Sequence, residues 1–482
     1  MIFLVLFIAL ILRLINLNQS LWLDEAVQAI TAKGPFWGIF EELWGDFHPP
    51  LYHILMWGWV RIFGASEVSL RLPSVLFGVG CIFVMYKIAM HVHHEIITAG
   101  RKDGIGAVLV AVFLATAPFH IYYSQEARMY SLGTFLAALS MYYFGKILNL
   151  KSQNSKLHLK SKIFYFISTL CLVYSDYYGF LILLAQMIFL MTKKQFRFIV
   201  LSSSFIILSY FLWLPFLITQ FKTGLTATSD LPGWGNLVNI NFFKALPLTF
   251  VKFAIGRITI FDRRLYALVA VIIFGIYGWI GGYNSYKSYK NNKYYKLILF
   301  WFLIPILGAW LGSLVVPNYQ PFRLLLVLPA FYLLLAMGIS SLQSNKVAVF
   351  LSFFVVLVNL TSLFVYYKNP YFWREDWRGV ANLVRTNDVP IIISAQAFNW
   401  PLVYYGVDDK VINVAPGAKP VELSDIPSLL KKAADKNEIF YTPYLADLYD
   451  PKKLVPTWFE KDGFVKIKEI SFNQIPLWIY KK

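Results

Sequence analysis

Long apolar runs separated by short polar segments make up most of the chain as far as residue 369. An α-helix needs about 20 mainly apolar residues to cross the hydrocarbon core of a bilayer. The pattern therefore predicts a polytopic α-helical membrane protein with about eleven spans. The predicted spans are residues 1–17, 68–90, 104–121, 129–148, 162–175, 177–192, 198–219, 265–283, 296–315, 322–342 and 346–368.

One further apolar run, residues 50–64, is too short for a comfortable span and is rich in aromatic side chains. Counted as a span, it would place the basic loops that follow outside the cell, against the usual bias of Lys and Arg toward the cytoplasm. We interpret it as a helix lying in the outer interface, with a short span as the alternative. Residues 18–67 then form a first external loop that contains this helix, and residues 220–264 form a second.

The pattern changes after residue 369, where charged and turn-forming residues separate short alternating segments. Helices are predicted near 377–385 and 427–434, and strands near 391–394, 410–414, 438–442, 465–470 and 476–480. Such an alternation is typical of a small α/β domain. We therefore expect a transmembrane domain, residues 1–369, and an extracytoplasmic α/β domain, residues 370–482.

The orientation follows from the distribution of positive charge between the predicted spans. The connections 91–103, 149–161, 193–197 and 284–295 are basic, whereas the short connections 122–127, 176 and 316–321 carry no Lys or Arg. The basic residues are Arg101, Lys102, Lys151, Lys156, Lys160, Lys193, Lys194, Arg197, Lys287, Lys290 and Lys293. Because basic loops stay in the cytoplasm, we expect a multi-pass plasma-membrane protein with its N-terminus inside the cell and its C-terminal domain outside.

The composition agrees with a membrane protein. The chain is 58% hydrophobic and only 15% charged, against about 25% charged residues in an average soluble domain. The net charge of +18 is explained by the cytoplasmic loops, so we expect no nucleic-acid partner. Cys81 and Cys171 both lie in apolar runs, which argues against a disulfide framework or a metal site.

Asp24 and Glu25 are the first of six polar groups predicted at the outer surface. Carboxylates at a membrane surface are costly unless they are hydrated, paired or functional. The alternative is a helix cap, with Asp24 as the N-cap of a helix over residues 25–33 and Glu25 favouring its dipole. The two interpretations are compatible, because a capped turn is a rigid way to aim a carboxylate.

Three further groups carry one basic residue each. His48, in the sequence His48-Pro49-Pro50, could bind a phosphate or merely precede the interfacial helix. Arg71 and Arg323 both begin a predicted span from the outside. Each could contact substrate, or simply extend its charge to the interface.

The remaining two groups are a cluster of polar residues between spans and a turn. Glu126, Arg128 and Tyr130 lie together at the outer ends of two predicted spans. Arg128 could neutralise Glu126 locally, or its planar fork could hold a phosphate. Asp176 is explained by turn chemistry. Since all six groups project to one side of the membrane, the sequence predicts an active site at the outer interface.

Four segments occur in the order found in membrane glycosyltransferases: residues 20–26 with Asp24-Glu25, 48–52 with His-Pro-Pro-Leu-Tyr, 69–74 and 123–130. The chain resembles the GT-C superfamily that includes protein O-mannosyltransferases and aminoarabinose-lipid A transferases. The resemblance is clearest over about the first 220 residues. It implies a GT-C-like fold, a polyprenyl-phosphate-linked sugar donor, and transfer at the outer face to a glycan, lipid or protein acceptor.

The resemblance also places an acidic residue of the first external loop at the reaction centre, a role that falls on Asp24 with Glu25 beside it. Some relatives carry a second acid just after the Arg/Tyr motif, where this chain has Tyr130 and Ser131. Glu126 lies nearby, but its correspondence to that acid stays open.

The implied chemistry needs a base for the acceptor hydroxyl or amine and cations for the departing phosphate. We predict Asp24 and Glu25 as the catalytic residues, with Asp24 as the base. The predicted residues for donor phosphate and substrate are His48, Arg71, Glu126, Arg128, Tyr130 and Arg323. A single base-assisted attack by the acceptor would invert the anomeric centre. No cofactor is required, although a divalent metal between Asp24 and the phosphate is compatible with this chemistry.

Two other classes of protein are weighed against this hexosyl- or pentosyltransferase. A lipid or lipid-linked sugar flippase predicts polar or broken segments near the membrane midplane and repeat symmetry, whereas the polar groups here gather at one surface. A receptor with an external ligand-binding domain would leave the interfacial polar cluster without a purpose.

Overall fold

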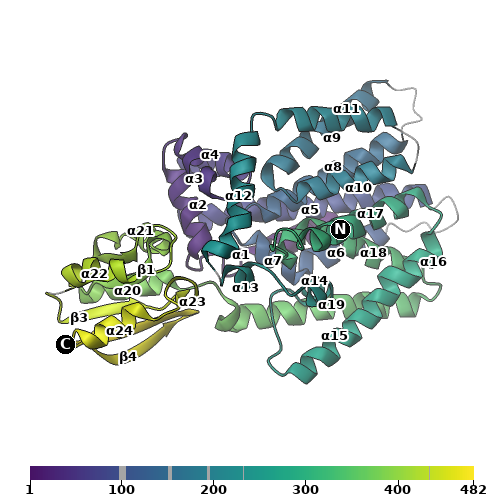
Figure 1. Cartoon of the computed structure of the whole chain (residues 1–482). Helices are drawn as coiled ribbons and strands as arrows, with labels where there is room; N and C mark the ends of the chain where they lie inside the picture. The colour runs from purple at the N-terminus through teal and green to yellow at the C-terminus, as the bar shows by residue number, and fades with distance from the viewer. Residues whose placement is uncertain (97–104, 150–154, 193–195, 232, 434) are drawn as a thin grey trace.

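The computed structural model describes the whole chain except residues 97–104, 150–154, 193–195, 232 and 434. A large helical part carries a smaller part with a β-sheet at one end (Figure 1). The basic residues Arg101, Lys102, Lys151, Lys193 and Lys194, on which part of the predicted orientation depends, lie outside the described residues. So does residue 434, the predicted end of a helix in the C-terminal domain.

Five helical stretches of the described residues are long and apolar enough to cross a membrane, and up to seven if two bent pairs each count as one span. The five are Glu67–Val92, Arg263–Tyr289, Lys293–Gly312, Pro321–Ser340 and Asn345–Lys368. Each predicted span contains a helix, but α1 (Ile2–Leu14) and α10 (Gly179–Met191) have only 13 residues each. The predicted count of eleven spans is therefore not confirmed.

Two segments predicted as single spans are broken. Helix α6 (Ile105–Thr116) meets α7 (Pro118–Ser124) at 58°, and α11 (Phe196–Ser209) meets α12 (Leu214–Asp230) at 79°. The first break follows from Pro118, which lacks an N–H and clashes with the preceding turn. The buried Arg13 of α1 donates to the carbonyls of Leu114 and Ala115, both at 3.2 Å, near the C-terminal end of α6. Arg13 thus supplies donors to the last carbonyls of α6, of which that of Leu114 also accepts from the Ala117 backbone N–H at 3.4 Å.

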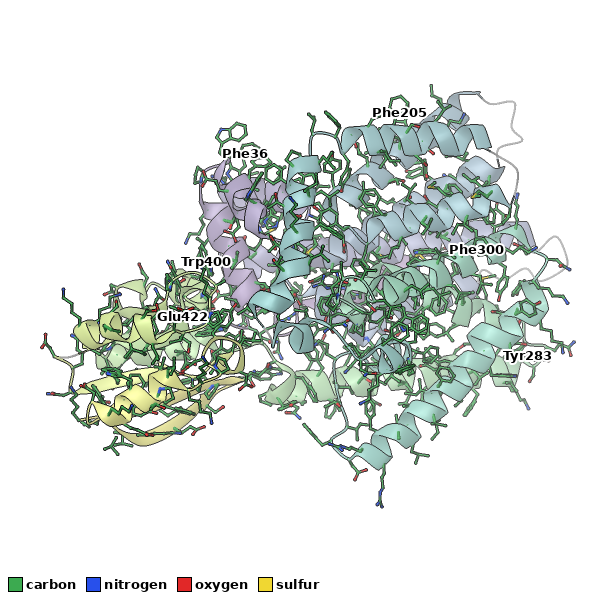
Figure 2. The ribbon with its side chains drawn as sticks, viewed as in Figure 1. Phe36, Phe205, Tyr283, Phe300, Trp400 and Glu422 are labelled. Carbon is green, nitrogen blue, oxygen red and sulfur yellow. The ribbon has the colours of Figure 1, made fainter. Side chains whose placement is uncertain are left out.

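Large apolar side chains cover the outside of the helical part. Phe205 of α11 is 61% exposed and Tyr283 is 60% exposed, and both lie at the periphery of the helices (Figure 2). Apolar surface on this scale is not stable against water. It fits a protein whose helices are surrounded by lipid.

The first predicted external loop is mostly helical. It contains α2 (Leu23–Lys33), the unpredicted α3 (Gly38–Gly45) and α4 (Leu51–Phe63). The 13 residues of α4 span only about 20 Å, which is short of a bilayer core. The predicted cap is wrong: α2 begins at Leu23 after Trp22, and no side chain caps it.

The second predicted external loop, residues 220–264, is also not a loop. Helix α12 continues to Asp230, and α13 (Trp234–Val238) and α14 (Phe242–Ile255) follow. The inner face of α14 packs into the main hydrophobic core through Ala245, Val251 and Phe253. The 14 residues of α14 are too few for a span, which is why its apolar pattern did not stand out in the sequence.

The C-terminal part is a mixed sheet covered on both faces. Its five strands, β1 (Ile391–Ala395), β2 (Val411–Ala415), β3 (Glu438–Thr442), β4 (Val465–Phe472) and β5 (Ile475–Lys481), lie in the order β2-β1-β3-β5-β4. Strand β1 is parallel to β2 and β3, and β5 is antiparallel to β3 and β4. Helix α20 (Trp377–Asn387) packs on one face, and α22 (Ile426–Ala433) and α24 (Leu454–Lys461) pack on the other.

Helix α21 (Trp400–Tyr404) of the C-terminal part lies against α2 (Figure 1), with Trp400 at this junction (Figure 2). The Tyr405 hydroxyl accepts from the Leu21 backbone N–H at 2.9 Å. Arg378 of α20 pairs with Glu67 at 2.9 Å. The junction thus brings the C-terminal part to the start of α2, where Asp24 and Glu25 lie.

Candidate active site

Asp24 and Glu25 occupy very different environments although they are adjacent. Both lie in the first turn of α2, and successive residues of an α-helix point about 100° apart. Glu25 is completely buried, whereas 38% of the Asp24 side chain is exposed. Only Asp24 of the two is therefore accessible to a substrate.

Glu25 forms a buried, two-pronged ion pair with Arg71 of α5 (Glu67–Ile96). Arg71 Nε donates to Glu25 Oε1 at 2.8 Å, and Arg71 Nη2 donates to Glu25 Oε2. The Ala127 backbone N–H also donates to Glu25 Oε1, at 2.8 Å. Burial raises the pKa of Glu25, but the Arg71 charge and these hydrogen bonds outweigh it and the net pKa is lowered. Glu25 is thus held ionised.

Arg71 makes three further hydrogen bonds to backbone carbonyls of the segment before α2. Its Nη1 donates to Leu17 at 2.9 Å and to Gln19 at 2.6 Å, and its Nη2 donates to Ser20 at 3.0 Å. With Glu25, these contacts use all five N–H donors of the guanidinium. In this arrangement Arg71 has no N–H donor left for the phosphate that it was predicted to bind. Arg71 instead fixes the first external segment to the second predicted span.

Arg128 stands between Asp24 and His48. Its Nη2 lies 3.4 Å from Asp24 Oδ2 and 3.4 Å from His48 Nε2. Burial lowers the pKa of Arg128, but the negative charges of Asp24, Asp46 and Glu126 contribute to a net increase. Its Nε has no hydrogen-bond partner within the described part of the chain. A permanently charged group with a free donor beside an accessible carboxylate is suited to bind an anion.

His48 is oriented by Asp46, a residue to which the sequence had assigned no role. His48 Nδ1 lies 2.9 Å from Asp46 Oδ1. Burial raises the pKa of Asp46, but the neighbouring His48, Arg128 and His53 lower it by more, so the net pKa is below its ordinary value. Since Arg128 donates toward His48 Nε2, the consistent tautomer has its proton on Nδ1, where it donates to Asp46. His48 therefore keeps a fixed ring orientation at the site.

Glu126 pairs with Arg374 of the C-terminal part and not with Arg128. Arg374 Nη1 lies 2.8 Å from Glu126 Oε2, and both side chains are buried. The Arg374 guanidinium also lies 3.9 Å from the centre of the Tyr122 ring. Burial raises the pKa of Glu126, although Arg374 opposes this. The local Glu126–Arg128 pair, one of the two alternatives considered from the sequence, is therefore not formed. Glu126 instead connects the two parts of the chain through Arg374.

The other predicted residues surround this group. Tyr130, the first residue of α8 (Tyr130–Asn149), is 7% exposed. Its ring packs edge-on to the ring of Phe322, with 5.2 Å between the ring centres. Arg323, next to Phe322, has an Nε atom without a partner in the described residues. Asp176 is buried, and burial raises its pKa, although the hydrogen bond that it accepts from the Tyr178 backbone N–H lowers it in part. Tyr130 lies close to both Arg128 and Arg323.

Three charged residues of this region were not predicted from the sequence. Arg374 and Glu375 follow directly on the predicted last span, in Trp373-Arg374-Glu375-Asp376-Trp377. Three consecutive charges flanked by Trp at a predicted membrane surface were a usable signal. Arg257 follows α14 and was hidden in the segment assigned to an external loop. Among the described residues, no group of three or more His, Cys, Asp or Glu side chains is placed to hold a metal ion.

The fold is similar to those of two kinds of solved membrane enzyme. ArnT from Cupriavidus metallidurans in the apo state superposes with a TM-score of 0.59, at 11% identity over 99% of this chain and 97% of that one. ArnT bound to undecaprenyl phosphate gives 0.57. The archaeal oligosaccharyltransferase AglB from Archaeoglobus fulgidus, in complex with an inhibitory peptide and a dolichol-phosphate, gives 0.54 at 12% identity over 92% of this chain and 69% of that one.

Comparison by sequence gives no relatives: no family model and no curated protein matches the chain. At the identities above, the structural likeness is one of fold.

Proposed function

We propose that this chain, which has the fold of the GT-C membrane glycosyltransferases, transfers a sugar from a polyprenyl-phosphate-linked donor to an acceptor at the outer face of the plasma membrane. The observation that carries the proposal is the position of Asp24. It is an accessible carboxylate 3.4 Å from a buried, permanently charged arginine, Arg128. This places a base next to a phosphate-binding cation, the combination that such a transfer needs.

Asp24 acts as the base. The acceptor hydroxyl or amine attacks the anomeric carbon of the donor sugar and loses its proton to Asp24. The new bond joins the acceptor oxygen or nitrogen to the anomeric carbon, and the bond from that carbon to the phosphate oxygen breaks. One such displacement inverts the anomeric centre. The electron pair of the broken bond leaves with the polyprenyl phosphate.

Arg128 and His48 receive the departing phosphate, with Arg323 and Tyr130 on the same side of the site. The free Nε of Arg128 offers a donor that its contacts with Asp24 and His48 do not use. Binding of the phosphate by Arg128 also draws that arginine away from Asp24, which frees the carboxylate for the acceptor. Charge-assisted hydrogen bonds of this kind are among the strongest that proteins make.

Glu25 and Arg71 position the base and do not contact the substrate. Their buried pair holds the first turn of α2 against α5 and against the Ala127 backbone N–H. Glu126 serves a similar purpose, because its pair with Arg374 attaches the C-terminal part to the site.

Asp24→Asn tests the proposal. The variant removes the base and keeps the shape of the side chain, so we expect transfer from a polyprenyl-phosphate sugar to fall by about 10²–10⁴-fold. Sugar transfer would be measured with purified protein and radiolabelled donor in lipid nanodiscs. The matched control is Asp388→Asn, whose side chain is 83% exposed in the C-terminal part. Transfer by Asp24→Asn within a few fold of the control would refute the assignment.

A further inference from the structure

A cavity of about 380 Å³ lies between the helical part and the C-terminal part. The helical part contributes Trp22, Tyr122 and Arg257, and the segment before α20 contributes Trp373 and Glu375. Its volume is in the range of small-molecule sites, roughly 300–1,000 Å³. Trp22 precedes Asp24 by two residues, and the lining residue Glu375 lies close enough to Asp24 for the two charges to interact, so the cavity adjoins the base.

Arg257 supplies this cavity with a positive charge, and no carboxylate of the described residues lies within ion-pair distance of it, although Glu126 acts on it from farther away and Glu375 lines the same cavity. Its side chain is exposed, its guanidinium lies 4.9 Å from the centre of the Tyr122 ring, and it makes no ion pair with another described residue. Arg374 lies over the same ring but is paired with Glu126. Two guanidinium groups at one ring repel each other, and an anion in the cavity would relieve this repulsion.

The rest of the lining suits a sugar. Trp22 and Trp373, both partly exposed, present aromatic rings on which the apolar face of a pyranose can pack. Glu375 accepts from the Tyr444 hydroxyl at 2.9 Å and from Trp377 Nε1 at 2.8 Å. These bonds fix a carboxylate that can accept a further hydrogen bond from a ligand hydroxyl.

We propose that this cavity is the acceptor subsite and that it selects an acceptor saccharide bearing an anionic group, a phosphate or a carboxylate, which Arg257 binds. The inference rests on the proposed transfer reaction and names its second substrate. The donor is an unsuitable occupant, because an isoprenoid chain needs an aliphatic lining. No Leu, Ile or Val of the described residues lines this cavity, whereas a cavity of about 620 Å³ between α5, α6, α18 (Leu328–Ser340) and α19 (Asn345–Lys368) is lined by many.

The test measures the preference of the purified protein for an anionic sugar. Dissociation constants for glucose 1-phosphate, glucuronate and glucose would be obtained by ligand-observed NMR titration. We expect both anions to bind about ten- to a hundredfold more tightly than glucose, as one charge-assisted hydrogen-bonded pair allows. Arg257→Gln should abolish this difference. Arg263→Gln, at an exposed arginine of α15 (Arg263–Tyr277), should preserve it.

Equal binding of charged and neutral sugars by the native protein would overturn the proposal, and so would an unchanged preference in Arg257→Gln. A third measurement is the affinity for a short polyprenyl phosphate, which Arg257→Gln should leave unaltered. If that affinity falls instead, the cavity holds the donor phosphate and the acceptor assignment is wrong. Arg257→Lys, which keeps the charge and loses the fork, should lose part of the preference and replaces the Gln variant if that variant does not fold. Sugar transfer is assayed separately, so failure of the proposed reaction can be recognised independently.

Discussion

Replacement of Arg71 by Met should destabilise the protein severely, although Arg71 does not touch the proposed substrate. The change leaves Glu25 buried with one remaining donor, the Ala127 N–H, and removes the donor to three backbone carbonyls. Removing one partner of a buried pair costs about 3–5 kcal/mol. That is a large part of the total stability of about 5–15 kcal/mol that is usual for folded proteins. We therefore expect Arg71→Met to lower the melting temperature markedly.

The assay is thermal unfolding in detergent, with Arg378→Met as the control. Arg378 also pairs with a glutamate, Glu67, but its side chain is 39% exposed. An exposed pair contributes only about 0–1 kcal/mol, so the control should melt close to the native protein. The double variant Glu25→Gln/Arg71→Met should be more stable than Arg71→Met, because no buried charge remains. Equal melting temperatures for Arg71→Met and Arg378→Met would refute this reasoning.

Three further outcomes are expected. Burial lowers the pKa of His53 to about 4, below the ordinary value of about 6.5, so the unfolded chain binds a proton first as the pH falls. Stability should thus decrease by about 3 kcal/mol from pH 6.5 to pH 4, and denaturant titrations of His53→Gln should lack this component. Gly256 has φ +72°, and a Cβ there would lie 2.9 Å from Pro118 Cβ. Gly256→Ala should cost at least about 1–3 kcal/mol and displace Arg257, measured as a lower melting temperature and a weaker preference for glucose 1-phosphate; a native-like variant would contradict this. A C-terminal tag should be accessible to antibody on intact cells, and access only after permeabilisation would reverse the predicted orientation.

The C-terminal sheet shows what local patterns can predict. Ile391, Ile392 and Ile393 alternate between the two covered faces of β1, and runs of this kind between turn residues identify strands without knowledge of their partners. All five predicted strand segments are strands in the structure. Helix breaks were less evident, because Pro118 lies within an apolar run whose composition satisfies a single span.

Pairing of charged residues could not be predicted from sequence. Asp24 and Glu25 look alike in the chain, and only the packing of α2 against α5 decides which is buried. Arg71 was expected either to contact substrate or to extend its charge to the interface. Its actual partner, Glu25, belongs to a different helix. Glu126 pairs with Arg374, far away in the chain. Such contacts depend on tertiary geometry, which residue types and spacing do not contain.

The pair of Glu126 with Arg374 has a consequence for biogenesis. About 250 residues separate the two, and at about 5–20 residues per second the arginine is synthesised roughly ten to fifty seconds after the glutamate. Until the C-terminal part has been made and has docked, Glu126 lacks its counter-ion and the cavity wall formed by Trp373 and Glu375 is absent. The cavity proposed for the acceptor is therefore complete only after the last quarter of the chain has been synthesised and has docked.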